Sequence, residues 1–546
     1  MTGQVNHPSH IRPEVIAFHM PLPARFLAPV FLLVVQGAFE ASAAQEAEDI
    51  CPLSVSLSSG RANRRCLDLR RLPLPAGPDF EITSRWTLLP FRSTGSYRNA
   101  YPADRNNGAH WAGRGLSSDV SGGFRVQVGG LILSVEPELV WAQNLGFALP
   151  DTTTLGLSSF SYPWGNGRLD RFIRPGNWRS LQFDLGNSFF EVRTGPLSAG
   201  VSNETLWWGP ARRYPLLFSG TSGGFPHAYA QTSRPLETAF GALTARLLWG
   251  QLRESRWYDA DPGNNRTLLG AFQLGWRIDF VPGLELAYSV VRHEPLPDGD
   301  LKLGQLGQLF AGDPDDEDPA RRGMPMGTVS VRFGFPEEGF EAYAEVGRGE
   351  GFLNPVPGLS DSRLSLIYTL GFARTDTTSS GGRWRVSGEL VRQAMGLPQP
   401  AAPTLAVTTH APPRNGHGHT HGGQLLGAWI GPGSNAQYVA VDWLRQTHTF
   451  GFFAERARRD DDTYFRLHAR DYAFRGHDLE WTLGVRGGGR LGGGPTMGPI
   501  GVGIDMAISR RKNRDFVGLD QGGNRVFVRE WNAWADVYLV WNPIRS

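Results

Sequence analysis

The sequence is poor in cysteine and lysine: its 546 residues include two cysteines, and only two of its 54 basic residues are lysines. It also lacks the basic excess of a nucleic-acid-binding protein, because 54 basic and 52 acidic side chains leave a formal net charge of +2. The composition excludes a disordered chain, since 40% of the residues are hydrophobic and 11% are aromatic. The 69 glycines favour many strands and turns over long helices.

Long hydrophobic runs are absent except near the N-terminus. There Arg25 precedes the apolar run 26–35, and the small residues 41–44 follow it, which together form the three parts of a secretory signal peptide. We therefore predict a leader over residues 1–44, with translation starting at Met20 and cleavage at the end of the small-residue run. No other stretch reaches about 18 consecutive apolar residues, so no transmembrane helix is expected in the mature chain.

The two cysteines, Cys51 and Cys66, lie within residues 45–100, which we expect to form a short N-terminal periplasmic extension. An exported chain meets an oxidising compartment, so the pair predicts one disulfide that closes a short loop. Two free thiols, or a redox pair, are the alternatives. The spacing fits neither a C-x-x-C redox motif nor a zinc site, so no cofactor is predicted here.

Beyond residue 100 the clearest signal is an alternation of apolar and polar residues. In 328–335, apolar side chains occupy every second position. The same period of two recurs in 243–249, 340–346, 535–541 and many other segments, which are separated by connections rich in Gly, Pro, Asn and Asp. A period of two gives a strand one apolar face and one polar face.

Two all-β architectures fit this pattern: a soluble sandwich or propeller, and a transmembrane barrel. A propeller needs an internal repeat of about 40–50 residues, and the sequence shows none. A barrel places the apolar face in lipid and the charged face in the lumen, and its interfacial girdles account for the many aromatic residues. We therefore predict a large antiparallel β-barrel of about 16–18 strands over residues 101–546, in the outer membrane of a Gram-negative-type cell.

Several blocks of the sequence resemble the Wzi-type capsule assembly proteins of the outer membrane. The most specific block is Ser202–Pro210, which reads S-N-E-T-L-W-W-G-P. The other blocks are Asn106–Leu116, Pro215–Ser219, Gly224–Ala228, Thr232–Pro235 and Gly423–Pro432, so that the resemblance covers about residues 100–546.

The resemblance implies a barrel of about 18 strands that binds capsular or related exopolysaccharide and supports its assembly or retention at the cell surface. It implies a lectin-like protein rather than an enzyme, with no cofactor. Residues 45–100 depart from those family members that carry a periplasmic helical bundle, because they are rich in Pro and Arg.

The residues themselves also favour sugar binding. Trp207 and Trp208 lie beside the rigid turn Gly209-Pro210, and flat indoles can stack on sugar rings. Arg212 and Arg213 follow, and guanidinium groups can hold uronate, sulfate or phosphate substituents. The alternative is that the Trp pair packs a loop inside the barrel mouth or joins the aromatic girdle. Two further pairs offer the same sugar-binding chemistry: Trp111 with Arg114, and His227 with Arg234.

Three other features do not predict a site. His417, His419 and His421 would share one face of a strand and could bind a transition metal, but they follow a Pro-rich stretch, so a solvated loop is predicted. Asp313–Asp318 lacks the ligand spacing of a calcium loop. The G-x-S-x-G stretch around Ser222 lacks the strand-to-helix elbow that exposes a nucleophile. We therefore predict neither a metal site nor a catalytic residue.

Two functions remain open at this point: a polysaccharide-binding surface protein, and a porin or substrate-specific diffusion channel. The long segments 195–240, 295–327 and 393–435 can fill or cover the barrel mouth, which favours the binding protein. We expect a monomer whose partners are outer-membrane lipid and a surface polysaccharide, with no nucleic acid among them.

Overall fold

The computed structural model describes residues 85–150, 152, 158–165, 169–258, 265–296, 326–335, 338–349, 367–378, 381–394, 417–445, 448–470, 476–491, 498, 500–517 and 528–541. The predicted leader, the cysteine pair Cys51 and Cys66, and the acidic stretch Asp313–Asp318 lie outside these residues. Among the described residues, no helix combines the length and the apolar character that a membrane crossing requires.

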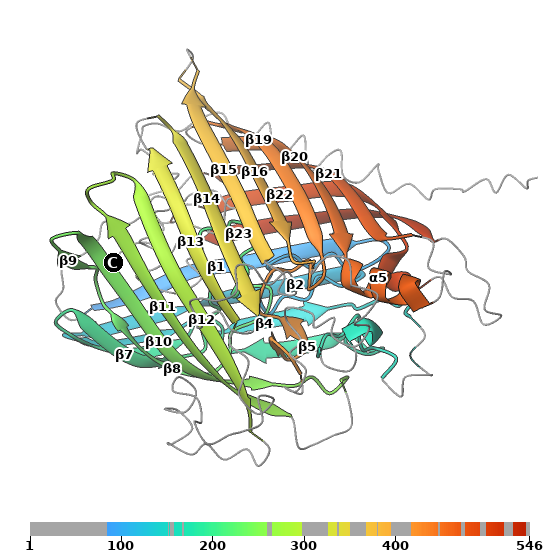
Figure 1. Cartoon of the computed structure of the whole chain (residues 1–546), viewed down its shortest axis with the longest axis horizontal. Coiled ribbons are helices and arrows are strands. Elements are labelled where there is room, and N and C mark those ends of the chain that lie inside the picture. Colours follow the sequence, from blue (N-terminus) through green and yellow to red (C-terminus); the bar gives the residue numbers. More distant parts are fainter. Residues whose placement is uncertain are drawn as a thin grey trace, which may run out of the picture. The chain divides into compact units, whose positions relative to one another are not determined.

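The described chain forms a closed antiparallel barrel of 18 strands (Figure 1), which confirms the predicted fold class. The strand segments are β1 (Arg85–Arg98), β2 (Gly115–Val128), β3 (Leu131–Val135), β4 (Glu138–Ala142), β5 (Ser180–Asp184), β6 (Phe189–Thr194), β7 (Leu197–Ser202), β8 (His227–Thr232), β9 (Leu236–Thr238), β10 (Gly241–Arg253), β11 (Arg266–Ile278), β12 (Leu284–Pro295), β13 (Met326–Phe335), β14 (Phe340–Gly349), β15 (Ile367–Thr377), β16 (Arg383–Arg392), β19 (Asn435–Leu444), β20 (His448–Arg459), β21 (Asp478–Leu491), β22 (Ile500–Lys512) and β23 (Arg529–Trp541).

Closure of the wall comes from the first and last strands, because β1 pairs with both β2 and β23. Three wall strands are interrupted and consist of two short segments each: β3 with β4, β5 with β6, and β8 with β9. The shorter elements are η2 (Pro163–Gly165), the hairpin of β17 (Thr420–His421) and β18 (Gln424–Leu425), α5 (Asp461–Arg470) and η4 (Arg514–Phe516).

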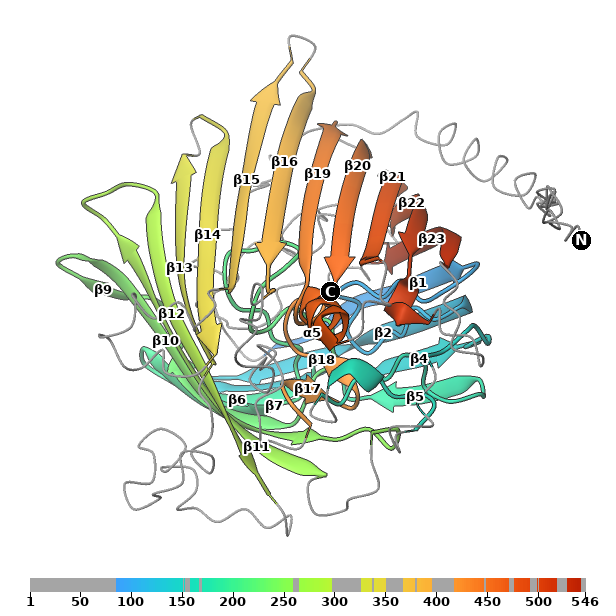
Figure 2. The ribbon, with the colours of Figure 1, turned by 45° about the vertical axis from the view of Figure 1, so that its right-hand side comes forward.

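The connections alternate between short and long. Short turns such as 129–130, 195–196 and 239–240 lie at one end of the barrel, together with the start of β1 and the end of β23. Long connections such as 203–226 and 393–434 begin at the other end (Figure 2). Because outer-membrane barrels have short periplasmic turns and long extracellular loops, we call these the periplasmic end and the outer end.

The alternation predicted from the sequence forms the two faces of the wall. On β13, Val329 and Phe335 face lipid with 44% and 42% of their surface exposed, whereas Arg332 between them is 6% exposed in the lumen. On β14, Glu341 and Glu345 are buried on the lumen side. Lipid accepts only apolar side chains, whereas the lumen accepts charged ones that find partners. Because successive side chains of a strand point to opposite faces, these two surroundings require apolar and polar residues to alternate along each strand.

The wall begins before residue 101. β1 lies within the range 45–100, which the sequence assigned to the extension, yet it pairs with strands on both sides. Its register with β2 shifts between Leu89 and Arg92, around Pro90. Proline cannot donate a backbone hydrogen bond to a neighbouring strand, so it interrupts the pairing and obscures the alternation in the sequence.

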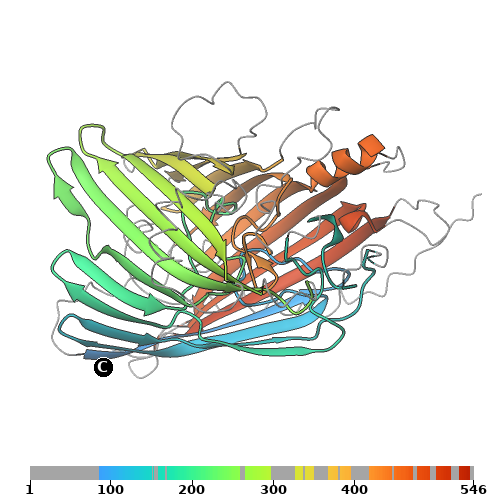
Figure 3. The same cartoon turned by 60° about the horizontal axis from the view of Figure 1, so that its bottom comes forward.

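Parts of four connections from the outer end fold back into the lumen (Figure 2, Figure 3). They are the described residues of 99–114, 158–173, 203–226 and 417–434, and together we call them the plug.

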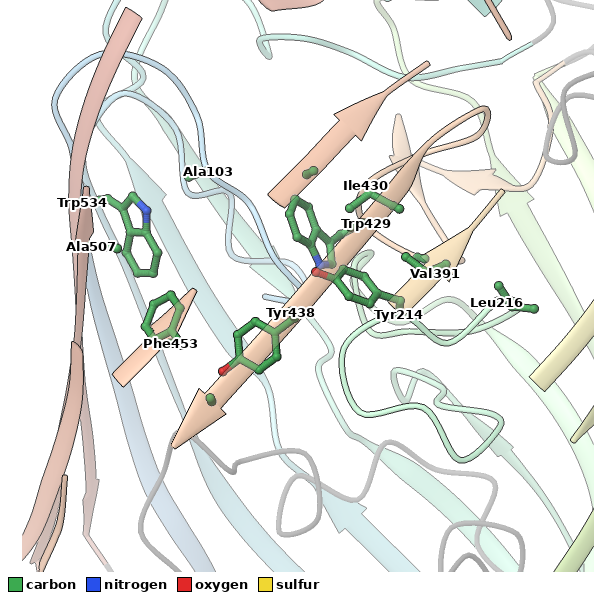
Figure 4. Packing of buried hydrophobic residues seen from close by; sticks show 14 of the residues in the cluster. Ala103, Tyr214, Leu216, Val391, Trp429, Ile430, Tyr438, Phe453, Ala507 and Trp534 are labelled. Carbon is green, nitrogen blue, oxygen red and sulfur yellow. The ribbon is translucent and has the colours of Figure 1, made fainter. Parts of the chain in front are cut away.

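Plug and wall share one hydrophobic interior. Tyr214, Leu216 and Ile430 of the plug belong to the same buried cluster as Ala507 and Trp534 of the wall (Figure 4). A second cluster joins plug side chains to β10, β11 and β12; its members include Trp208, Phe218, Leu248, Leu269 and Val291. The lumen is therefore packed with protein at this level rather than lined by it.

Candidate functional site

The Trp207-Trp208 block belongs to the plug, and both indoles are buried. Trp208 is 0% exposed, and its ring lies edge-on against Phe218 with the ring centroids 4.9 Å apart. The Nε1–H of Trp207 donates to the carbonyl oxygen of Ala211 at 3.1 Å. Both side chains thus pack within the plug and stabilise it. This is the alternative to sugar binding that the sequence left open.

The backbone that follows this block is held by a carboxylate of the wall. Glu389, on β16, accepts hydrogen bonds from the backbone N–H groups of Arg212, Arg213 and Tyr214 at 2.8, 3.0 and 2.7 Å. It also accepts a hydrogen bond from the hydroxyl of Tyr343 at 2.5 Å. Irregular backbone is tolerated at membrane depth only where its polar groups find partners inside the protein. One glutamate therefore satisfies three consecutive N–H groups.

Gly209 lets the same segment pass close to a second glutamate. Its φ of 92° is in the left-handed region, and a Cβ at this position would lie 2.8 Å from the carboxylate of Glu345. Glu345, on β14, accepts a hydrogen bond from the N–H of Leu216 at 3.2 Å. A larger residue at 209 would meet both backbone strain and a clash. The packing of the plug therefore requires the glycine of the W-W-G-P block.

The two arginines after the block form ion pairs with the wall. Arg213 donates to Glu455 of β20 at 2.7 Å, and the hydroxyl of Tyr214 donates to the same carboxylate at 2.9 Å. Burial disfavours the charged form of Arg213, but the nearby Glu455 carboxylate outweighs it and raises the pKa of this guanidinium. Arg212 pairs with Glu341 of β14. Both guanidinium groups are thus engaged within the protein.

A stack of alternating arginine and tryptophan side chains joins the plug to the wall. The guanidinium of Arg105 lies 5.1 Å from the ring centre of Trp429 and 4.8 Å from that of Trp534. Arg459 lies 5.0 Å from Trp429, and Arg98 lies 5.1 Å from Trp534 (both indoles are labelled in Figure 4). Desolvated cation–π contacts are worth about 2 kcal/mol each. The stack connects two segments of the plug to three strands of the wall.

The histidine stretch is buried, so the prediction of a solvated loop is wrong there. His417 and His419 are both 0% exposed and lie just before the β17–β18 hairpin of the plug. A ring nitrogen of His419 lies 2.9 Å from a ring nitrogen of His293 on β12, and the other lies 2.7 Å from the carbonyl oxygen of Leu217. These partners are distant in sequence, so no local pattern reveals them. No group of three potential metal ligands occurs in the part of the chain that the structure describes.

The remaining predicted sugar-binding residues do not form one group. Trp111 is half-buried, with its ring edge-on to Phe172 at 5.0 Å, and Arg114 follows it just before β2 at the outer end. His227 is buried on β8. Arg234 is exposed between β8 and β9, close to the short turn 195–196 at the periplasmic end. The structure therefore gathers Trp207, Trp208, Arg212, Arg213 and His227 inside the lumen and leaves Arg234 far from Trp111 and Arg114.

An aromatic and basic patch at the outer end, exposed except for a half-buried tryptophan, was not among the sites predicted from the sequence. Trp178 is 85% exposed, and exposed Arg179 follows it just before β5. A Cβ on Gly176 would lie 2.7 Å from the ring of Trp257, which shows that the loop before β5 touches the loop after β10. The guanidinium of Arg256 lies 5.2 Å from the Trp257 ring. We call Trp178, Arg179, Arg256 and Trp257 the outer patch; adjacent Trp and Arg residues were its only sequence signal.

No family model and no curated protein matches this chain. Among solved structures, the barrel is similar to Wzi, a carbohydrate-binding outer-membrane β-barrel involved in group 1 capsule assembly in Escherichia coli. The TM-score is 0.52 at 11% identity, and the match covers 82% of this chain and 84% of Wzi.

Two further matches are OccAB4 of Acinetobacter baumannii and the outer membrane protein OprD of Pseudomonas aeruginosa. Their TM-scores are 0.40 and 0.39 at 9% and 10% identity; they cover 85% and 84% of this chain, and 99% and 93% of their own. At 11% identity, the likeness to Wzi concerns the fold alone. The chain is thus a closed β-barrel with a Wzi-like fold.

Proposed function

We propose that the protein binds a surface polysaccharide, capsular or exopolysaccharide, at the outer end of an occluded barrel and supports its retention at the cell. The observation that carries this proposal is the plug, whose segments are packed and ion-paired within the lumen. A diffusion channel needs a water-filled path, whereas a binding protein needs a rigid surface. The likeness in fold to a carbohydrate-binding barrel supports the same proposal.

In this proposal the outer patch makes the direct contacts, together with Trp111 and Arg114. The exposed indole of Trp178 and the free edges of the half-buried indoles can stack on the apolar faces of sugar rings, and guanidinium groups can hold acidic substituents. Trp207, Trp208 and Arg213 are buried, so their contribution is to hold the plug that supports this surface.

The test measures binding of the purified barrel in detergent to an immobilised uronate-rich polysaccharide and to a neutral one. We expect the double variant Trp178→Ala, Trp257→Ala to bind about tenfold more weakly, because each lost aromatic contact is worth about 0.5–1.5 kcal/mol. Arg256→Ala should weaken binding to the acidic polymer alone, and salt should reduce that difference. The matched control is Trp86→Ala, since Trp86 is 59% exposed on the outer face of β1.

The same proteins distinguish the binder from the channel. A binder reconstituted in planar bilayers should show no steady open conductance. Stable ion conductance of the wild type, together with unchanged polymer binding by the double variant, would contradict the proposal and favour a diffusion channel. A polymer engages many copies at once on a cell, so small losses per site should appear as a large loss of retained polysaccharide.

A further inference from the structure

Basic side chains gather on the outward face of three neighbouring wall strands at the outer end of the barrel. They lie on β20, β22 and β23, and we call them the basic strip: Arg456, Arg458, Arg510, Lys512 and Arg529. The strands β19 to β23 are side by side (Figure 2), and their pairing places Trp481 of β21 between Arg456 and Arg510. In the next row outward, Leu479 lies between Arg458 and Lys512. Neither row contains an acidic side chain.

The basic strip lies where the apolar surface of this part of the wall ends. The next row toward the periplasmic end is entirely apolar on its outward face and consists of Val439, Ala454, Leu483, Ile508 and Ala533. Trp481 and Trp531, in the same row as Arg456, are 53% and 60% exposed, and tryptophan is enriched where lipid chains meet headgroups. Charged side chains are costly in the middle of a bilayer and are tolerated near its surface. The strip is therefore at the level of the lipid headgroups on the outer side.

Other sectors of the wall differ at the same end. The strands β1, β2, β4 and β5 have no charged side chain on their outward face there; the residues are Tyr97, Leu116, Ser118, Trp141 and Leu181. The strands β10, β11 and β12 carry charges of both signs, since Glu294 lies one row from Arg253 and Arg266. The basic strip is thus a local feature of one sector rather than a belt around the barrel.

The contacts of two cations in the strip leave their charge in place. The guanidinium of Arg456 donates to the side-chain oxygens of two uncharged residues of β19 at 3.1 and 2.8 Å. The guanidinium of Arg510 lies 5.4 Å from the ring centre of Trp531. Arg458 differs, because it pairs with the carboxylate of Asp461 at 2.5 Å. Uncharged partners orient a guanidinium group without neutralising it, so the strip attracts anions.

We propose that the basic strip binds the phosphate groups of a phosphorylated glycolipid in the outer leaflet of the outer membrane. Arg456 and Arg510 are two strands apart, about 10 Å, and Arg510 and Lys512 are about 7 Å apart along β22. Long basic side chains at this spacing can hold two phosphates of one headgroup, and the apolar row beside them meets the acyl chains. An acidic polysaccharide is less suited, because the strip faces lipid on the side of the wall. The proposal rests on the outer-membrane location and is independent of the outer patch.

The test measures binding of bisphosphorylated lipid A to the purified barrel in detergent by native mass spectrometry, beside the same lipid without its phosphates. The double variant Arg510→Gln, Lys512→Gln should bind the phosphorylated lipid about tenfold more weakly than the wild type, because two charged contacts are lost. The lipid without phosphates should bind both proteins equally weakly. The matched control is Arg253→Gln, Arg266→Gln, which removes two exposed charges at the same end and should change the affinity by less than about twofold.

Two results would overturn the proposal directly. One is an equal loss of lipid binding in the two double variants, and the other is a wild-type affinity that does not depend on the phosphates. Binding to the uronate-rich polysaccharide separates the strip from the outer patch. The Arg510→Gln, Lys512→Gln barrel should retain that binding; loss of polymer binding with unchanged lipid binding would assign the strip to the polysaccharide and overturn the proposal. Heat-dependent migration on gels checks that each variant forms a barrel, which is expected because the substituted side chains lie on its outer surface.

Discussion

The wall and the plug satisfy their backbones in different ways. In the wall, each strand finds its hydrogen-bond partners in the next strand, and this continues around the closed sheet. In the plug, Arg212, Arg213 and Tyr214 have no neighbouring strand as partner for these N–H groups, and the carboxylate of Glu389 takes that place. The wall therefore depends on many equivalent bonds, whereas the plug depends on a few particular side chains.

This difference predicts unequal responses to substitution. A lipid-facing side chain of the wall can be shortened with little loss, because lipid fills the space that it leaves. A plug residue that is removed leaves unpartnered polar groups or a cavity inside the protein. The following experiments compare the two regions, from the largest expected effect to the smallest.

Glu389→Ala should have the largest effect. It leaves three backbone N–H groups and the hydroxyl of Tyr343 without their acceptor, at about 1–3 kcal/mol for each group. We expect hydrogen exchange in residues 207–218 to accelerate strongly while exchange in β16 and β19 stays slow. Glu389→Gln keeps one acceptor oxygen and should be intermediate. Protection of 207–218 equal to the wild type in both variants would show that the plug does not depend on this carboxylate.

Trp208→Ala should loosen the plug by about 3–5 kcal/mol, because it removes a fully buried indole from its cluster. The matched change in the wall is Trp481→Ala, since Trp481 is 53% exposed on β21. We expect Trp208→Ala to lower the thermal unfolding temperature in detergent more than Trp481→Ala does. Only Trp208→Ala should accelerate amide hydrogen exchange in residues 203–226. Equal destabilisation by both would contradict the distinction between plug and wall.

Gly209→Ala should cost about 1–3 kcal/mol, because alanine is strained at a φ of 92° and its Cβ would press on Glu345. Gly95→Ala in β1 is the control, because nothing lies within 4 Å of the added Cβ. Tryptophan fluorescence can report the denaturant concentration at which half of the plug is unfolded. This midpoint should fall for Gly209→Ala and should equal the wild-type value for Gly95→Ala. An unchanged midpoint for Gly209→Ala would mean that this backbone position is not constrained.

Acid should weaken the plug through His417. Burial lowers the pKa of this imidazole from 6.5 to about 4, so the folded plug favours the neutral form. The contribution of His417 to stability is complete above pH 6.5 and is lost as the pH falls toward 4. Amide hydrogen exchange of residues 417–425, corrected for its intrinsic pH dependence, should accelerate as the pH is lowered from 7 to 5. His417→Gln should flatten that dependence, and an identical profile in the variant would assign the effect to another group.

Much of the wall could be predicted from the sequence because its signal is local. The spacing of Val329, Arg332 and Phe335 along β13 is enough to assign each side chain to the lipid face or to the lumen face. No contact with a distant residue is needed for that assignment. β1 was not predicted as a wall strand because Pro90 interrupts its alternation. The W-W-G-P block was recognised as important, but its role was open, since stacking on a sugar and packing inside a lumen call for the same residues.

The sequence by itself determined the class of fold: a period of two repeated through the chain can satisfy lipid on one side and a polar lumen on the other only in a closed sheet. The tertiary structure alone decided what fills that lumen. Glu389 meets residues 212–214, and His293 meets His419, across more than a hundred positions of sequence. Such contacts depend on how the connections fold back between the strands, and no local pattern of residues encodes the partner of a buried charge.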